Sequence, residues 1–92
     1  MILNFACTDT EALFGTGRSK RWGNILNVAT RKLAMLNAAA GLRDLKSPPG
    51  NMLEALLGNR AGQYSIRIND QFRICFVWTD TGPKNVEIVD YH

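Results

Sequence analysis

The sequence predicts a single α+β domain in which two to three N-terminal helices pack on one face of an antiparallel sheet of about four to five strands. Apolar residues recur at helical spacing in the first half of the chain and at alternate positions in the second half. The loop Ser47-Pro48-Pro49-Gly50 separates the two halves. Because the expected strands follow one another directly, they favour an antiparallel sheet over a parallel one.

Composition narrows the class of protein. The 92 residues, 46% of them hydrophobic, suffice for one domain over residues 1–92. No apolar stretch approaches the ~18–20 residues of a membrane-spanning helix, so we expect a cytoplasmic protein. Two distant cysteines and a single histidine supply neither a zinc site nor a disulfide scaffold, so we expect reduced, half-buried thiols, no metal and no cofactor. The net charge of +3 is compatible with an anionic partner.

The first elements are expected to be short. Residues 2–5 predict a strand. The pattern Thr8-Asp9-Thr10-Glu11 predicts a capping box, in which the threonine and glutamate side chains bond the first free amides of a helix. We therefore expect a short helix at residues 11–14, closed by the glycines that follow it.

The main helix is expected from about Trp22 to Ala40, with Gly41 ending it and residues 42–46 adding one further turn. Its apolar residues fall on one stripe, which should pack against the sheet. The stripe consists of Trp22, Ile25, Leu26, Ala29, Leu33 and Leu36.

Four strands are expected after the loop, with turns at residues 58–62 and 81–83. The strands are Met52–Leu57, Gln63–Ile68, Phe72–Trp78 and Asn85 to about Tyr91.

The register of the two middle strands follows from their alternation. One strand has apolar residues at positions 64, 66 and 68, and the next has them at 72, 74 and 76. Both sets face the core only if the loop has an odd number of residues, here residues 69–71. This register places Arg67 opposite Arg73 on the other face. Like charges opposite each other destabilise a sheet, so either the two side chains splay apart into solvent or an anionic ligand binds between them.

The sequence ends in Asp90-Tyr91-His92, which extends the last strand toward the arginines. Regular alternation puts Tyr91 on the arginine face and turns Asp90 and His92 away from it. All three converge on one site only if the chain twists or leaves the sheet near its end. The other interpretation is a frayed tail.

Together these residues suit metal-free RNA cleavage, in which a 2′-hydroxyl attacks the neighbouring phosphate. Histidine titrates near neutrality, so His92 can act as acid or base. Arg73 and Arg67 can bind phosphate oxygens through the guanidinium fork. Tyr91 can stack on a base or bond the reacting groups.

At this point the sequence resembles a known family. The segments Gly58–Asn69, Gln71–Phe76 and Val89–His92 look like the HigB toxins, a branch of the RelE-like superfamily. The motif elements are Gly-x-Arg-x-Gly, which contains Arg60, then x-Phe-Arg-x-x-Phe, which contains Arg73, and the closing Asp-Tyr-His. The resemblance covers essentially the whole chain.

The resemblance implies a toxin that cuts mRNA on the ribosome without metal. It implies a HigA-type antitoxin with a helix-turn-helix, and operator DNA bound only through that antitoxin. By this likeness Asp90, Tyr91, His92 and Arg73 are expected catalytic residues, and Arg60, Arg67 and Arg73 are expected to bind substrate.

Two positions depart from the family pattern. Many HigB toxins carry a histidine and then a lysine before the Gly-Asn-Arg turn, where this chain has Glu54 and Leu57. Glu54 can serve as a general base in place of the histidine, or it is only an exposed strand carboxylate. Since Leu57 removes a cation, we expect a ribonuclease of weak or moderate activity.

Alternatives remain open. ParE-like inhibitors of DNA gyrase use the same architecture without catalysis, and the chain is also compatible with an antitoxin co-repressor that has lost RNase activity. Five basic residues are expected to form a solvated face that can contact ribosomal RNA or be covered by the antitoxin. They are Arg18, Lys20, Arg21, Arg31 and Lys32.

Overall fold

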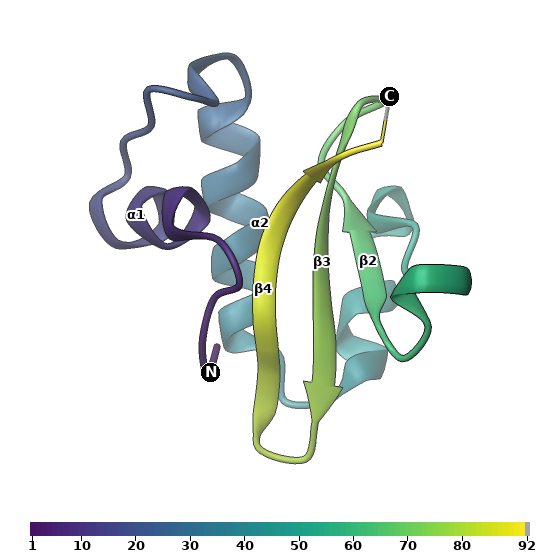
Figure 1. The fold of residues 1–92 in the computed structure, drawn as a ribbon. Helices are drawn as coiled ribbons and strands as arrows, with labels where there is room; N and C mark the ends of the chain where they lie inside the picture. The colour runs from purple at the N-terminus through teal and green to yellow at the C-terminus, as the bar shows by residue number, and fades with distance from the viewer. Residues whose placement is uncertain (92) are drawn as a thin grey trace.

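The computed structural model describes residues 1–91 and has the predicted α+β architecture. Two helices lie on one side of a four-stranded antiparallel sheet in the order β1-β2-β3-β4 (Figure 1). The elements are α1 (Thr8–Thr16), α2 (Leu26–Ala38), β1 (Glu54–Ala55), β2 (Tyr64–Arg67), β3 (Phe72–Thr79) and β4 (Gly82–Asp90). Among the helices of residues 1–91, none is long and apolar enough to cross a membrane. Short 3-10 turns complete the chain: η1 (Gly23–Ile25), η2 (Leu42–Lys46), η3 (Pro49–Asn51) and η4 (Gly58–Arg60).

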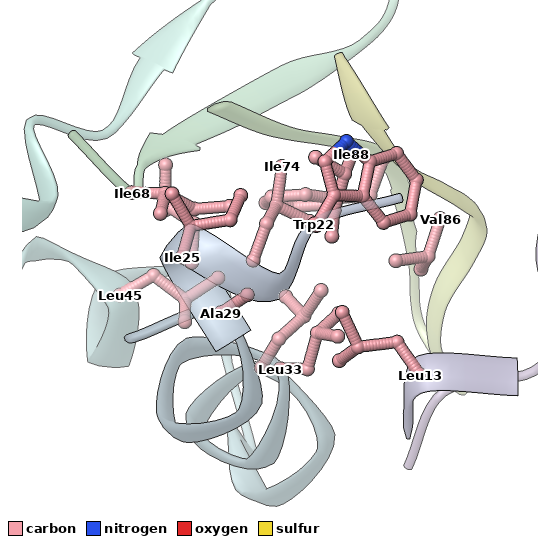
Figure 2. Close-up of a cluster of buried hydrophobic side chains, with 13 residues drawn as sticks. Leu13, Trp22, Ile25, Ala29, Leu33, Leu45, Ile68, Ile74, Val86 and Ile88 are labelled. Atoms are coloured by element: carbon pink, nitrogen blue, oxygen red, sulfur yellow. The ribbon is translucent and has the colours of Figure 1, made fainter. Parts of the chain in front are cut away.

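The core lies between the helices and one face of the sheet. Figure 2 shows the side chains of the helices and those of the strands meeting in one apolar layer. The predicted stripe of the main helix is confirmed as the buried face, except that Leu26 is only partly buried. Burying one such side chain fully contributes roughly 1.5–3 kcal/mol. The sheet contributes Ile66, Ile68, Ile74, Phe76, Val86 and Ile88 to this layer.

The predicted register of the middle strands is confirmed. Ile66 pairs with Ile74 and Arg67 pairs with Arg73 across the β2–β3 ladder. The amide of Ile68 donates to the carbonyl of Phe72 at 2.9 Å, so the connecting loop has the three residues expected. The apolar residues of both strands therefore share the helix-facing side, and the two arginines share the opposite one.

The capping box was predicted wrongly. The α1 helix begins at Thr8, its N-cap is Cys7, and no side-chain hydrogen bond of the described residues caps it. Thr10 is buried, and its hydroxyl oxygen accepts a hydrogen bond from the Ile88 amide at 3.0 Å. This contact satisfies an amide on the outer edge of β4, so a buried hydroxyl inside the expected motif bonds a distant strand.

The expected first strand is reduced to a single bridge. Phe5 pairs in parallel with Val86, and backbone hydrogen bonds on either side of it tie residues 3–6 to β4. Figure 1 shows this N-terminal segment running beside β4. The segment therefore covers the edge of the sheet without forming a full strand.

The main helix is shorter than predicted at both ends. It starts with the 3-10 turn η1 and ends at Ala38, before the expected Gly41. The Asp44 carboxylate explains the early end, since it accepts the amides of Ala40 and Gly41 at 2.9 and 3.1 Å and so starts the next turn, η2.

Two sheet boundaries also differ from prediction. The strand expected at Met52–Leu57 is reduced to β1, and at its start Met52 adopts a left-handed conformation that is incompatible with a strand. The last turn lies at residues 80–81, and Gly82 and Pro83 already belong to β4. Pro83 is tolerated there because β4 has no neighbouring strand on its other side to require a ladder amide, and only residues 3–6 lie along it.

Candidate functional site

The candidate site lies on the face of the sheet that the helices leave open. Alternation along β2 and β3 places Ser65, Arg67, Arg73 and Cys75 on this face, since their neighbours point into the core. The end of β4 lies beside the loop that joins β2 to β3 (Figure 1). Tyr91 follows it, and its ring lies against Arg73 on the same face. The structure therefore brings residues from three strands together.

Arg73 is held by two hydrogen bonds on this face. Its Nε donates to the Ser65 hydroxyl at 2.7 Å, and its Nη2 donates to the Met52 carbonyl at 2.6 Å. Its side chain is only 12% exposed, which is low for an arginine on a face without covering helices. Two contacts to separate elements fix the plane of the guanidinium. The group is therefore held in place instead of moving freely in solvent.

Arg67 faces Arg73 but has a different partner. Its Nη2 pairs with the Asp70 carboxylate in the β2–β3 loop, and that carboxylate is 97% exposed. The like-charge pair is thus accommodated by separate acceptors on either side of the ladder. An exposed ion pair of this kind contributes at most about 1 kcal/mol, so a stronger anionic ligand can compete with Asp70 for Arg67.

Tyr91 lies over the arginine face, as alternation predicted. Its ring centroid is 5.9 Å from the Arg73 guanidinium carbon, within range of a cation–π contact. Its hydroxyl is 3.9 Å from the Cys75 sulfur, and its amide donates to the Gln71 carbonyl at 2.6 Å. The residue is held through its hydroxyl and its backbone amide, and it remains 43% exposed.

The thiol and the phenol beside Arg73 both stay protonated at neutral pH. Burial raises the pKa of Cys75, and the hydrogen bond with Tyr91 only partly offsets this shift. Burial, followed by the Cys75 contact, raises the pKa of Tyr91. A neutral phenol can donate a hydrogen bond to a phosphate oxygen. Cys75 is free and fully buried, in contrast to the half-buried thiol expected from sequence.

Glu54 stands next to Arg73 on the edge strand. It pairs with Ser65 across the β1–β2 ladder, and its Oε1 is 3.9 Å from Arg73 Nη2. Its side chain is 54% exposed. A carboxylate in this position can accept a proton from a ligand that is bound by Arg73.

Arg60 and Asp90 occupy the borders of this face. Arg60 Nη1 contacts Gln63 Oε1 at 3.0 Å and Glu87 Oε2 at 3.4 Å. Asp90 pairs with Phe72 in the ladder and accepts a hydrogen bond from Gln71 Nε2 at 3.1 Å. Its position opposite Phe72 puts it on the helix-facing side, as alternation predicted. His92, the last candidate, lies outside the described residues.

Two shallow hollows flank Tyr91, which lines both of them. On one side the lining includes Met52, Arg67 and Arg73, and on the other it includes Glu54, Leu57 and Arg60. A larger hollow lies beside α1 and is lined by residues such as Arg18, Lys20 and Arg21. That hollow contains none of the predicted site residues, so its size does not make it the better candidate.

Sequence reasoning missed three contributors to the Arg73 environment. Ser65 and Cys75 follow from the alternation that places the arginines, so the pattern contained a signal for both. The sequence contained no signal for the Met52 carbonyl, because residue type does not determine the direction of a backbone carbonyl at a turn. Within residues 1–91, no group of three or more His, Cys, Asp or Glu side chains is placed to hold a metal ion.

The predicted solvated basic face is wrong at Lys32. This side chain is buried, with 6% exposure, and its ammonium group bonds the side-chain oxygen of Asn51. Arg21 is exposed, as expected, but it pairs with Asp9 at 3.2 Å and lies over the Trp22 ring. The five basic residues therefore do not form one free patch.

Comparison with known proteins agrees with the fold. A family model described as a RelE-like toxin of type II toxin–antitoxin system HigB matches residues 11–92. The chain belongs to this family of HigB toxins.

Individual relatives cover parts of the chain. A segment of 57 residues is 49% identical to Toxin HigB-1 of Vibrio cholerae, and it spans 62% of this chain and 60% of that protein. A segment of 73 residues is 37% identical to an uncharacterized protein of Haemophilus influenzae, and it spans 79% of this chain and 72% of that protein.

Proposed function

We propose that this chain is the toxin of a toxin–antitoxin pair and that it cleaves mRNA on the ribosome as a metal-independent endoribonuclease of weak or moderate activity. The observation that carries the proposal is the placement of Arg73. Its guanidinium is fixed on an open sheet face between Tyr91 and Glu54, where a phosphodiester can approach it. Membership of the HigB family supports the same activity.

The chemistry requires a base, an acid and a group that stabilises charge. The base removes the proton of the 2′-hydroxyl, whose oxygen attacks the adjacent phosphorus. The bond from phosphorus to the 5′-oxygen then breaks, and the acid protonates that oxygen. Arg73 stabilises the charge that develops on the phosphate oxygens, because its donors are already oriented before the reaction.

Glu54 and His92 are the proposed proton-transfer groups. Glu54 lies 3.9 Å from Arg73, so a phosphate held by Arg73 would bring the adjacent ribose within its reach. His92 directly follows Tyr91 and is the only histidine of the chain. A neutral Tyr91 would stack on a base or donate to a phosphate oxygen. Asp90 is assigned to holding the tail, through its bond with Gln71.

Substrate binding is assigned to the two hollows beside Tyr91. Arg67 and Arg73 line the first, which suits the scissile phosphate and its neighbour. Arg60 lines the second and would contact the next part of the RNA backbone. Arg60 and Arg67 each form an internal ion pair, so binding exchanges a weak protein contact for a charge-assisted bond to phosphate.

The proposed partner is a HigA-type antitoxin with a helix-turn-helix, and the chain would reach operator DNA only through it. Family membership supports an antitoxin partner. Co-expression with the antitoxin encoded beside it should give a stable complex that restores growth.

The decisive experiment adds the purified chain to a translating extract and maps the 5′ ends of the mRNA. New ends that require active translation are expected. Intact mRNA together with lost DNA supercoiling would favour a ParE-like gyrase inhibitor instead. Intact mRNA without any growth defect would favour an antitoxin co-repressor.

A further inference from the structure

The buried pair Lys32–Asn51 has no role in the site described so far. Lys32 comes from α2 and Asn51 from η3, and their side chains meet at the foot of the loop that precedes β1. Asn51 is fully buried and Lys32 is 6% exposed. Burying an ammonium group against a neutral amide is unfavourable, and burial lowers the pKa of Lys32, with Arg31 and Arg67 adding to the shift. An apolar residue would fill this space at lower cost.

Asn51 holds the turn η3 in place, and Met52 directly follows this turn. Its side-chain nitrogen Nδ2 donates to the carbonyls of Leu45 and Ser47 at 3.1 and 3.3 Å, and its side-chain oxygen Oδ1 accepts a hydrogen bond from the Lys32 ammonium group. Every polar atom of this side chain is therefore bonded. The turn is held against both α2 and η2, and it cannot rotate without breaking several buried contacts.

Met52 follows this turn in a strained conformation. Its φ of 46° and ψ of 53° lie in the left-handed region, which methionine rarely adopts. Such a conformation persists only where the surrounding contacts hold it. Its consequence is the direction of the Met52 carbonyl, which accepts the 2.6 Å hydrogen bond from Arg73 Nη2.

We propose that Lys32 and Asn51 are positioning residues for Arg73, which act by holding Met52 in the left-handed conformation that aims its carbonyl at the guanidinium. The catalytic consequence of this assignment rests on the proposed ribonuclease function, whereas the positioning of Arg73 does not. The chain of contacts runs from α2 through Asn51 and Met52 to Arg73, over elements that are distant in sequence. It supplies one of the two hydrogen bonds that fix the guanidinium plane, and Ser65 supplies the other.

The first test separates backbone conformation from side-chain loss. Met52→Gly and Met52→Val both remove the methionine side chain, but glycine adopts positive φ freely and valine resists it. Exchange of the Arg73 Nη protons with water, followed by NMR on the protein alone, reports the hydrogen bond to Met52, because Nη2 is its donor. We expect wild-type exchange in Met52→Gly and roughly tenfold faster exchange in Met52→Val, as for the loss of one hydrogen bond of ordinary strength. Equal exchange in the two variants overturns the proposal.

The second test uses the buried pair itself. Lys32→Met keeps the aliphatic stem and removes the ammonium group, and Lys84→Met makes the same chemical change at an exposed position. Faster Arg73 exchange is expected in Lys32→Met and in Asn51→Ala, with no change in Lys84→Met. If Asn51→Ala fails to fold, Lys32→Met and the two Met52 variants still decide the matter.

The third test asks whether Asn51 acts through Arg73 in RNA cleavage. Asn51→Ala should lower kcat/KM roughly tenfold in the wild-type background and should have no further effect in Arg73→Gln. A merely structural role gives the same loss in both backgrounds, and that result would refute the positioning assignment. If the wild-type chain cleaves no RNA, the proposed function fails, while the NMR measurements still test the positioning.

Discussion

The two faces of the sheet are held together by different interactions, although they are built from alternate residues of the same strands. The helix-facing side is filled by fully buried apolar residues such as Ile66, Ile74 and Phe76. The open side carries Arg67, Arg73 and other polar groups that are each held by a specific acceptor. Apolar packing tolerates many residue types of similar volume, while the open face depends on hydrogen-bond direction. Stability is therefore concentrated on one face and the proposed chemistry on the other.

The largest expected effect is a loss of stability caused by a substitution on the helix-facing side of the sheet. Phe76→Ala should lower the free energy of unfolding by about 3–5 kcal/mol, because it removes a large, fully buried ring and leaves a cavity. Urea denaturation measures the loss. Leu57→Ala is the matched control, since Leu57 is 85% exposed, and its effect should stay within about 0.5 kcal/mol. A similar loss in both variants would show that the burial of Phe76 is not the source of the stability.

The next largest effect is a loss of catalytic activity without a loss of stability. His92→Ala should reduce RNA cleavage roughly 10²–10⁴-fold, the usual contribution of a general acid or base, and leave the urea midpoint unchanged. Cleavage is measured by end mapping in a translating extract. A variant that is as active and toxic as the wild type would remove His92 from the mechanism.

A comparable but smaller loss is expected at the centre of the open face. Arg73→Gln should slow cleavage roughly 10²–10³-fold, because the developing charge on phosphate loses its oriented donors. Lys84→Gln removes an exposed charge of β4 and should leave the rate unchanged. If both substitutions slow cleavage equally, general charge attraction and not the geometry of Arg73 explains activity.

Glu54→Gln should have a weaker effect, a loss of roughly tenfold, since the carboxylate is 54% exposed and stands 3.9 Å from Arg73. The rates of RNA cleavage by Glu54→Gln and by the wild-type protein, measured at the same pH, check this expectation. Unchanged activity would return Glu54 to the role of an exposed strand residue.

The smallest effect concerns pH and the buried thiol on the open face. The pKa of Cys75 is raised from 9.0 by burial, so above that pH the unfolded chain loses the thiol proton before the folded chain does. The free energy of unfolding should therefore fall as the pH rises past 9.0, and it should fall less steeply in Cys75→Ala. Urea titrations at neutral and alkaline pH measure the difference. Parallel slopes in both proteins would show that Cys75 does not contribute.

The sequence by itself determined the order of the elements, the core stripe of the main helix and the register that places Arg67 opposite Arg73. These features depend on periodicity, and a shift of one residue would expose a whole set of apolar side chains. Family membership likewise followed from motifs in the second half of the chain.

Only the tertiary structure decided how the polar groups are used. Thr10 bonds the edge of β4, and Lys32 is buried against Asn51 instead of facing solvent. Likewise, Arg73 is oriented by the carbonyl of Met52. Each of these contacts joins segments that are distant in the sequence. The physical reason is that burial can be anticipated from a repeating pattern, whereas the partner of a polar atom depends on which other segment folds against it.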